Sequence, residues 1–101
     1  MNEHHTLEAV LSTLVAHGEV DEHGIADLLY REEYSGRPGD VESDPLAQWI
    51  EDATGAIRVH LDCYLIEVVY PDGRIDSEYT PTVVADFLDK FDFGGYPNLV
   101  G

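Results

Sequence analysis

The spacing of the hydrophobic residues changes at Ile57, and this change constrains the fold more than any other feature of the sequence. Before Ile57 the apolar residues recur at intervals of three and four, which is typical of amphipathic helices. From Ile57 onward they alternate with polar residues, which is typical of a strand with one buried face. Because the chain has only 101 residues, we expect both parts to share one hydrophobic core in a single domain over residues 1–101.

The first helix is expected over residues 6–17. Thr6 is a suitable N-cap residue, and Gly18 stands where a glycine commonly ends a helix. We expect residues 1–5, ahead of the cap, to be frayed. The apolar side chains that fall on one face of this helix are Leu7, Val10, Leu11, Leu14 and Val15.

Two further helices are expected before the strands. Asp21 is placed to cap a short second helix, which is followed by a loop over residues 35–44. Asp44 and Pro45 form a cap and a first-turn proline, so a third helix is predicted from there to about Thr54. The inward residues are Ile25, Leu28 and Leu29 in the second helix and Leu46, Trp49, Ile50 and Ala53 in the third.

The alternation from Ile57 to Cys63 predicts a half-buried strand that continues to Tyr70. Apolar residues stand on both faces of its last part, from Leu65 onward, so we expect that part to be covered on both sides. Residues 71–74 are a Pro-Asp-Gly-Arg turn, after which the chain returns as a second strand over residues 74–79. This segment therefore predicts an antiparallel β-hairpin.

A last helix is expected over residues 81–92, ended by Gly94 and Gly95, and followed by an apolar tail over residues 94–101. The predicted fold class is α+β, with three N-terminal helices, an antiparallel β-hairpin and a C-terminal helix. The same order of elements is found in a winged helix with an added C-terminal helix, so a winged-helix-like fold is one interpretation. Order alone does not fix function.

The charge of the chain is far from balanced. The chain has twenty-one Asp and Glu residues but only five Lys and Arg residues, for a net charge of −16, and Lys90 is the only lysine. The acids are dispersed along the chain, without the long run that marks an acidic tail. In this composition the chain resembles a small acidic haloarchaeal protein of an uncharacterised family. The resemblance implies a halophilic cytoplasm with molar KCl, where repulsion between carboxylates is screened within about 3 Å.

Functional charge is the competing interpretation of the same composition. A mimic of DNA, or a partner for a basic protein, would also carry excess carboxylates. A mimic would place them in a row on one face, and their even dispersal therefore favours salt adaptation.

Compartment signals point to the cytoplasm. Cys63 is the only cysteine, so no internal disulfide can form. The first residues lack the basic and apolar regions of a signal peptide, and no apolar run reaches the roughly 18–20 residues that span a bilayer. We therefore expect a cytoplasmic protein without a membrane partner.

The winged-helix interpretation lacks the cations that DNA binding requires. The third helix offers Gln48, Glu51 and Asp52 where a recognition helix would need basic groups, and Arg74 in the turn stands near Asp72. Because phosphate contacts depend on Lys and Arg, the sequence disfavours nucleic acid as a partner.

An acidic loop raises the question of a cation site. Asp40, Glu42, Asp44 and Glu51 occupy positions 1, 3, 5 and 12 of a calcium-loop pattern. Pro45 replaces the glycine that the sharp turn of this loop needs. The pattern thus predicts weak cation association by Asp40–Asp44 at most, and whether that matters is left open.

Other polar residues do not form a catalytic or metal-binding pattern. On one strand His60 and Asp62 would face away from Cys63, which is expected to be a small buried residue on the core face. His17 and His23 lack the further ligands of a zinc site. We therefore predict no catalytic, cofactor-binding or metal-binding residues and no enzyme.

The tail is too apolar to extend into solvent, so it is expected to dock on its own domain or on a second copy of the chain. Its candidate interface residues are Phe93, Tyr96, Leu99 and Val100, and a homodimer through this region is our hypothesis. The predicted function is a non-enzymatic, salt-adapted protein-interaction domain of the cytoplasm, with an unidentified protein partner. The alternative is a winged-helix-like transcriptional regulator or DNA-associated protein.

Overall fold

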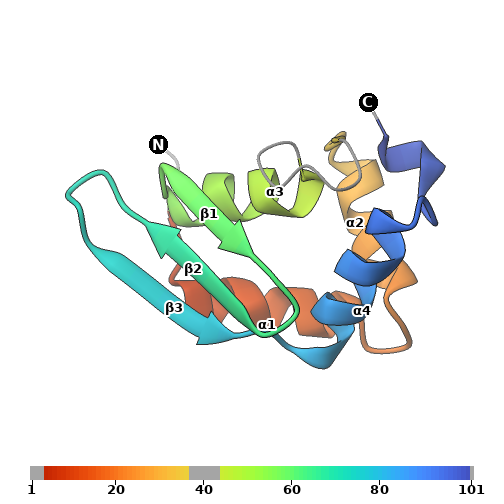
Figure 1. The fold of residues 1–101 in the computed structure, drawn as a ribbon, viewed down its shortest axis with the longest axis horizontal. Coiled ribbons are helices and arrows are strands. Elements are labelled where there is room, and N and C mark those ends of the chain that lie inside the picture. The colour runs from red at the N-terminus through yellow and green to blue at the C-terminus, as the bar shows by residue number, and fades with distance from the viewer. Residues whose placement is uncertain (1–3, 37–43, 101) are drawn as a thin grey trace.

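Three helices, three strands and a fourth helix follow one another in the computed structural model, which describes residues 4–36 and 44–100 (Figure 1). The strands form one antiparallel sheet in the order β1-β2-β3. The predicted α+β class is therefore confirmed. The elements are α1 (Leu7–His17), α2 (His23–Arg31), α3 (Pro45–Thr54), β1 (Arg58–Leu61), β2 (Leu65–Val69), β3 (Ile75–Tyr79), α4 (Thr82–Asp92) and the 3₁₀ helix η2 (Pro97–Leu99).

The predicted capping residues begin the first and third helices. The Thr6 hydroxyl accepts a hydrogen bond from the Ala9 N–H at 3.1 Å and so caps α1. At α3, Asp44 Oδ1 accepts from the N–H groups of Leu46 and Ala47, at 2.8 and 3.3 Å. Gly55 ends this helix at φ = 77°, a conformation that favours glycine. Local side-chain chemistry thus sets these boundaries.

The single strand predicted from Ile57 to Tyr70 is in fact two strands, β1 and β2. The predicted two-stranded hairpin is therefore corrected to a three-stranded sheet. Asp62 divides them, because its Oδ1 accepts hydrogen bonds from the N–H groups of Tyr64 and Leu65, both at 2.7 Å. A carboxylate that bonds the backbone two and three residues on closes a tight turn. The chain therefore reverses direction between β1 and β2.

Helices cover one face of the sheet. In Figure 1 the sheet lies in front of α1 and α3, with α2, α4 and η2 toward the other end of the molecule. The inward strand residues Val59, Ile66 and Val68 are buried against these helices. The largest fully buried side chains of the core include Leu7, Leu14, Ile25, Leu29, Leu46, Ile50, Phe87, Phe91 and Leu99.

The opposite face of the sheet is open, so the expectation that β2 is covered on both sides is wrong. Leu65 is exposed and Val69 is only partly buried. None of the described helices is long and apolar enough to cross a membrane.

The C-terminal tail docks on its own domain. Tyr96 and Leu99 are buried in the core, and the Gly36 N–H donates a hydrogen bond to the Leu99 carbonyl at 2.8 Å. This bond is part of an isolated parallel bridge between Gly36 and Val100. The tail thus packs on α2. This is the first of the two alternatives predicted for it, docking on its own domain rather than on a second copy.

Candidate interaction surfaces

The outer face of the sheet, here called the open face, presents alternate residues of all three strands. In the register, Leu65 lies opposite Tyr79, and Val69 lies opposite Ile75. Ile75 is 60% exposed and Tyr79 is 87% exposed. The outward residues of the open face are Arg58 and His60 in β1, Leu65, Glu67 and Val69 in β2, and Ile75, Ser77 and Tyr79 in β3.

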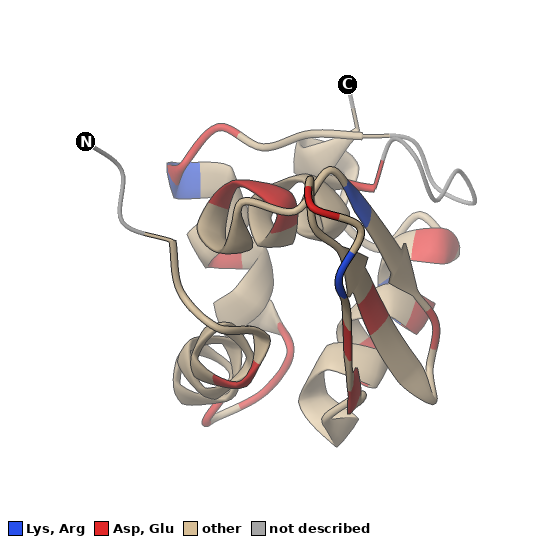
Figure 2. Cartoon of the chain, turned by 90° about the vertical axis from the view of Figure 1, so that its left-hand side faces the viewer, with Lys and Arg blue, Asp and Glu red and all other residues tan. Residues whose placement is uncertain are grey.

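The open face carries fewer carboxylates than the rest of the molecule. Within the three strands, Glu67 is its only acidic residue. Arg74, in the turn before β3, lies with its guanidinium carbon 4.4 Å from the centre of the Tyr70 ring, as a cation–π pair. Figure 2 shows acidic residues on helices, strands and loops around the molecule, as the dispersed sequence pattern predicted.

A groove of about 340 Å³ runs between α1 and the end of β3. Val15, predicted on the buried stripe of the first helix, is instead 45% exposed and lines this groove. Glu8 of α1 and Glu78 of β3 place a carboxylate on each wall. The complete lining is Glu8, Leu11, Ser12, Val15, Glu78, Tyr79 and Pro81.

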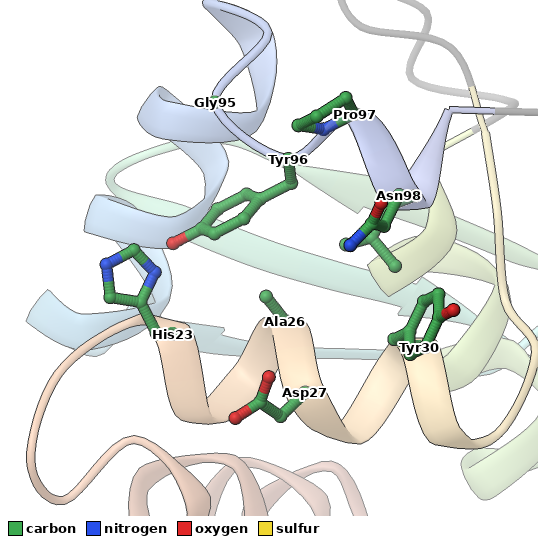
Figure 3. Close-up of a pocket in the computed structure, with 9 residues that line it drawn as sticks. His23, Ala26, Asp27, Tyr30, Gly95, Tyr96, Pro97 and Asn98 are labelled. Atoms are coloured by element: carbon green, nitrogen blue, oxygen red, sulfur yellow. The ribbon is translucent and has the colours of Figure 1, made fainter.

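A second pocket, of about 250 Å³, lies between α2 and the C-terminal tail (Figure 3). His23, Asp27 and Tyr30 line it from α2, and Tyr96 and Asn98 line it from the tail. The Tyr96 ring stacks on Phe87 with ring centres 5.3 Å apart. It also meets the His23 ring edge to face at 5.6 Å, so aromatic packing holds the tail in place.

Lys90 of α4 joins the same cluster. Its Nζ lies 3.4 Å from Glu22 Oε1 and 3.5 Å from His23 Nε2. The pKa of Glu22 is lowered, first by a hydrogen bond from the backbone and then by Lys90. These contacts connect the start of α2 to the end of α4.

The Tyr96 hydroxyl is buried and has no hydrogen-bond partner among the described residues. Burial, together with the nearby carboxylates of Glu22, Asp21 and Asp27, raises the pKa of Tyr96 to about 12. The phenol is therefore protonated at neutral pH and serves as an uncharged packing group.

The four predicted interface residues do not lie on one surface. Phe93 is 85% exposed and Val100 is 47% exposed, whereas Tyr96 and Leu99 are buried in their own chain. Their spacing in sequence gave no sign of this division, because the tail has neither helical nor strand periodicity.

Cys63 is exposed in the turn between β1 and β2, so the prediction of a buried thiol is wrong. The turn closed by Asp62 removes Cys63 from the strand whose alternation had placed it inward. His60 Nε2 lies 3.1 Å from Asp62 Oδ2, on the exposed side of the sheet. Backbone N–H groups of Leu65 and Tyr64, and then His60, lower the pKa of Asp62.

Most polar residues of α3 form hydrogen bonds within the chain. The Trp49 indole N–H donates to Glu32 at 3.0 Å, and the Tyr34 hydroxyl donates to Asp52 at 2.5 Å. Most of this helix is buried or half-buried, and it contains no Lys or Arg. Sequence spacing could not reveal these bonds, because they join α3 to the segment that follows α2.

The acidic loop lies mostly outside the described residues, which include Asp44 but not Asp40 or Glu42. Asp44 is buried as the N-cap of α3, and burial raises its pKa to about 6. Burial also raises the pKa of Glu51. Among residues 4–36 and 44–100, no three His, Cys, Asp or Glu side chains gather as potential metal ligands.

Comparison with protein-family models, with curated proteins and with solved structures finds no match to this chain.

Proposed function

We propose that the chain is a non-enzymatic protein-interaction domain that docks a partner protein on the open face of its sheet. The observation that carries this proposal is two cross-strand pairs of uncovered apolar side chains on the open face, Leu65 with Tyr79 at one end and Val69 with Ile75 at the other. Large exposed apolar side chains with polar groups among them are typical of protein-binding surfaces. Arg58 and His60 lie beside these pairs on β1 and Glu67 lies between them on β2, so they supply polar contacts for orientation.

A photoreactive side chain on the open face tests this proposal. Benzoylphenylalanine replaces Tyr79, and in a matched control it replaces Tyr30, a 59% exposed tyrosine on α2. After irradiation in the cells that make the protein, we expect a discrete covalent adduct with another protein from position 79 only. Equal labelling from both positions, or none from position 79, contradicts docking on the open face.

The high negative charge supports a cytoplasm rich in salt as the working environment of this domain. With a net charge of −16, mutual repulsion should destabilise the fold at low ionic strength. The half-buried Trp49 reports on folding, because its indole N–H bonds Glu32 across the α2–α3 connection. We expect circular dichroism and Trp49 fluorescence to show unfolding near 0.1 M KCl and recovery above about 1 M. Equal stability at both concentrations contradicts salt adaptation.

A homodimer through the C-terminal region stays a prediction, now limited to Phe93 and Val100. The mass measured by light scattering across the same KCl range tests it, with Phe93→Ser as the variant that should lose a dimer. A monomeric mass at every salt concentration contradicts the homodimer.

A winged-helix-like DNA-associated protein is the alternative function. Binding to a random duplex at high salt would support it. We expect no binding at any salt concentration, because α3 contains no cation and its Trp49 and Asp52 bond the segment after α2.

A further inference from the structure

We propose that the free edge of β3 accepts an extended segment of the partner protein in which apolar and basic side chains alternate. This inference rests on the proposed function for the partner being a protein, and it specifies how that partner binds. Among the described residues β3 pairs with β2 alone, and Figure 1 shows it at the rim of the sheet. An unpaired strand edge presents backbone N–H and C=O groups that can pair with an added strand.

The helix-side face of β3 is acidic. Asp76 lies opposite Val68 and Glu78 lies opposite Ile66, so both carboxylates point to the face that the helices cover. Neither carboxylate forms an ion pair with a described residue. A strand added at this edge would place every second side chain beside them, and Lys or Arg there would supply the missing opposite charges.

The other face of β3 is apolar at both ends. Ile75 and Tyr79 point outward with Ser77 between them, and both apolar side chains are largely exposed. The remaining side chains of an added strand would lie beside Ile75 and Tyr79 on the open face. The five residues of β3 therefore match a partner segment in the order apolar, basic, apolar, basic, apolar.

The groove beside β3 leaves room for the basic side chain that would lie beside Glu78. It contains about 340 Å³, with Glu8 of α1 facing it from one wall and Glu78 from the other. Leu11 and Val15 provide apolar contact for the methylene part of a lysine or arginine. A basic side chain in this groove would lie between carboxylates from two elements.

The same carboxylates argue against a second copy of the chain as the occupant. Pairing of β3 with another β3 would bring Asp76 and Glu78 of both copies together in one small sheet face. Inward-pointing charges of like sign on an edge strand oppose such self-pairing. A basic partner is therefore favoured over self-association.

Titration with a capped Val-Lys-Val-Lys-Val peptide tests the inference at the lowest KCl concentration at which Trp49 fluorescence reports the folded state. We expect the backbone amide NMR signals of β3 to shift and their hydrogen exchange to slow. Asp76→Asn with Glu78→Gln should weaken binding about tenfold, since two cross-strand charge pairs are lost. The control, Asp86→Asn with Asp89→Asn, removes the same charge from the exposed side of α4 and should change affinity less than about twofold.

Two further probes isolate the alternation and the backbone pairing. Lys-Lys-Val-Val-Val has the same composition and charge, and it should bind about tenfold more weakly because its basic and apolar groups do not alternate. N-methylation at the odd or at the even peptide positions should abolish binding in one case only, since alternate N–H groups face the partner strand.

Equal binding of the block-ordered peptide, or of both N-methylated peptides, overturns strand addition. Absence of peptide binding while position 79 still forms its protein adduct overturns this inference and leaves the proposed function standing. Peptide binding without any adduct from position 79 shows that the β3 edge can bind an added strand, and it contradicts the proposed docking of a partner on the open face.

Discussion

Asp44 provides a direct test of the electrostatics of the fold. It caps α3, with its Oδ1 bonded to the N–H groups of Leu46 and Ala47, and it is only 7% exposed. Burial raises its pKa from 3.8 to about 6, although the two backbone bonds act in the opposite direction. Above about pH 6, Asp44 therefore carries a negative charge at a position where burial disfavours the charged form.

The sign of the effect follows from proton binding. Between pH 3.8 and about 6 the folded state holds the Asp44 proton more tightly than the unfolded state does. Stability should therefore fall as the pH rises through this window, and stay level above it with respect to this group. At roughly 1.36 kcal/mol per pKa unit, the raised pKa of Asp44 corresponds to about 3 kcal/mol.

Asp44→Asn removes the charge and keeps an oxygen that can cap α3. We expect the variant to match the original protein near pH 4 and to be about 3 kcal/mol more stable near pH 8. Equilibrium urea unfolding at about 2 M KCl measures both, with general repulsion screened. The matched control is Asp86→Asn, an exposed carboxylate on α4. Equal stability of Asp44→Asn and this control at the higher pH refutes the reasoning.

Three further outcomes follow from burial. Tyr96→Phe should stabilise the fold by about 1 kcal/mol in urea unfolding, because the hydroxyl is buried without a described partner; a loss of stability would show that the hydroxyl is bonded in solution. Leu99→Ala should cost about 2–3 kcal/mol, because Leu99 is 1% exposed, whereas Val100→Ala at a half-exposed site should cost less than about 0.5 kcal/mol. Equal losses from these two variants contradict docking of the tail through Leu99. The thiol of Cys63 should react with a disulfide reagent in the folded protein about as fast as in urea, and strong protection contradicts its position in the turn.

Local sequence signals predicted the helices well because each of them acts within a few residues. Thr6 and Asp44 were identified as caps, and both bond the N–H groups that begin their helices. The spacing of the apolar residues in α1 and α3 likewise predicted buried side chains such as Leu14 and Ile50. These features depend on backbone geometry that a short segment determines by itself.

The strands in residues 57–70 were harder to predict than the helices, because two local signals in this segment favour different structures. Alternation from Ile57 favoured one long strand, whereas Asp62 favours a turn through hydrogen bonds to its own backbone. The turn prevailed, and Cys63 therefore became exposed. The signal that could have located this turn is an aspartate in the middle of the alternation, because its carboxylate can accept hydrogen bonds from the N–H groups two and three residues later.

Local signals were sufficient to predict the α+β class, the caps of α1 and α3, the turn at residues 71–74 and the dispersed acidic residues. Which apolar residues stay uncovered could not be predicted in this way, because burial depends on packing between elements far apart in the chain. Tyr96 and Leu99 became core residues when the tail packed on α2, while Leu65 and Tyr79 were left on the open face. The edge position of β3 arose in the same way, since the pairing of strands is a long-range contact that no local pattern specifies.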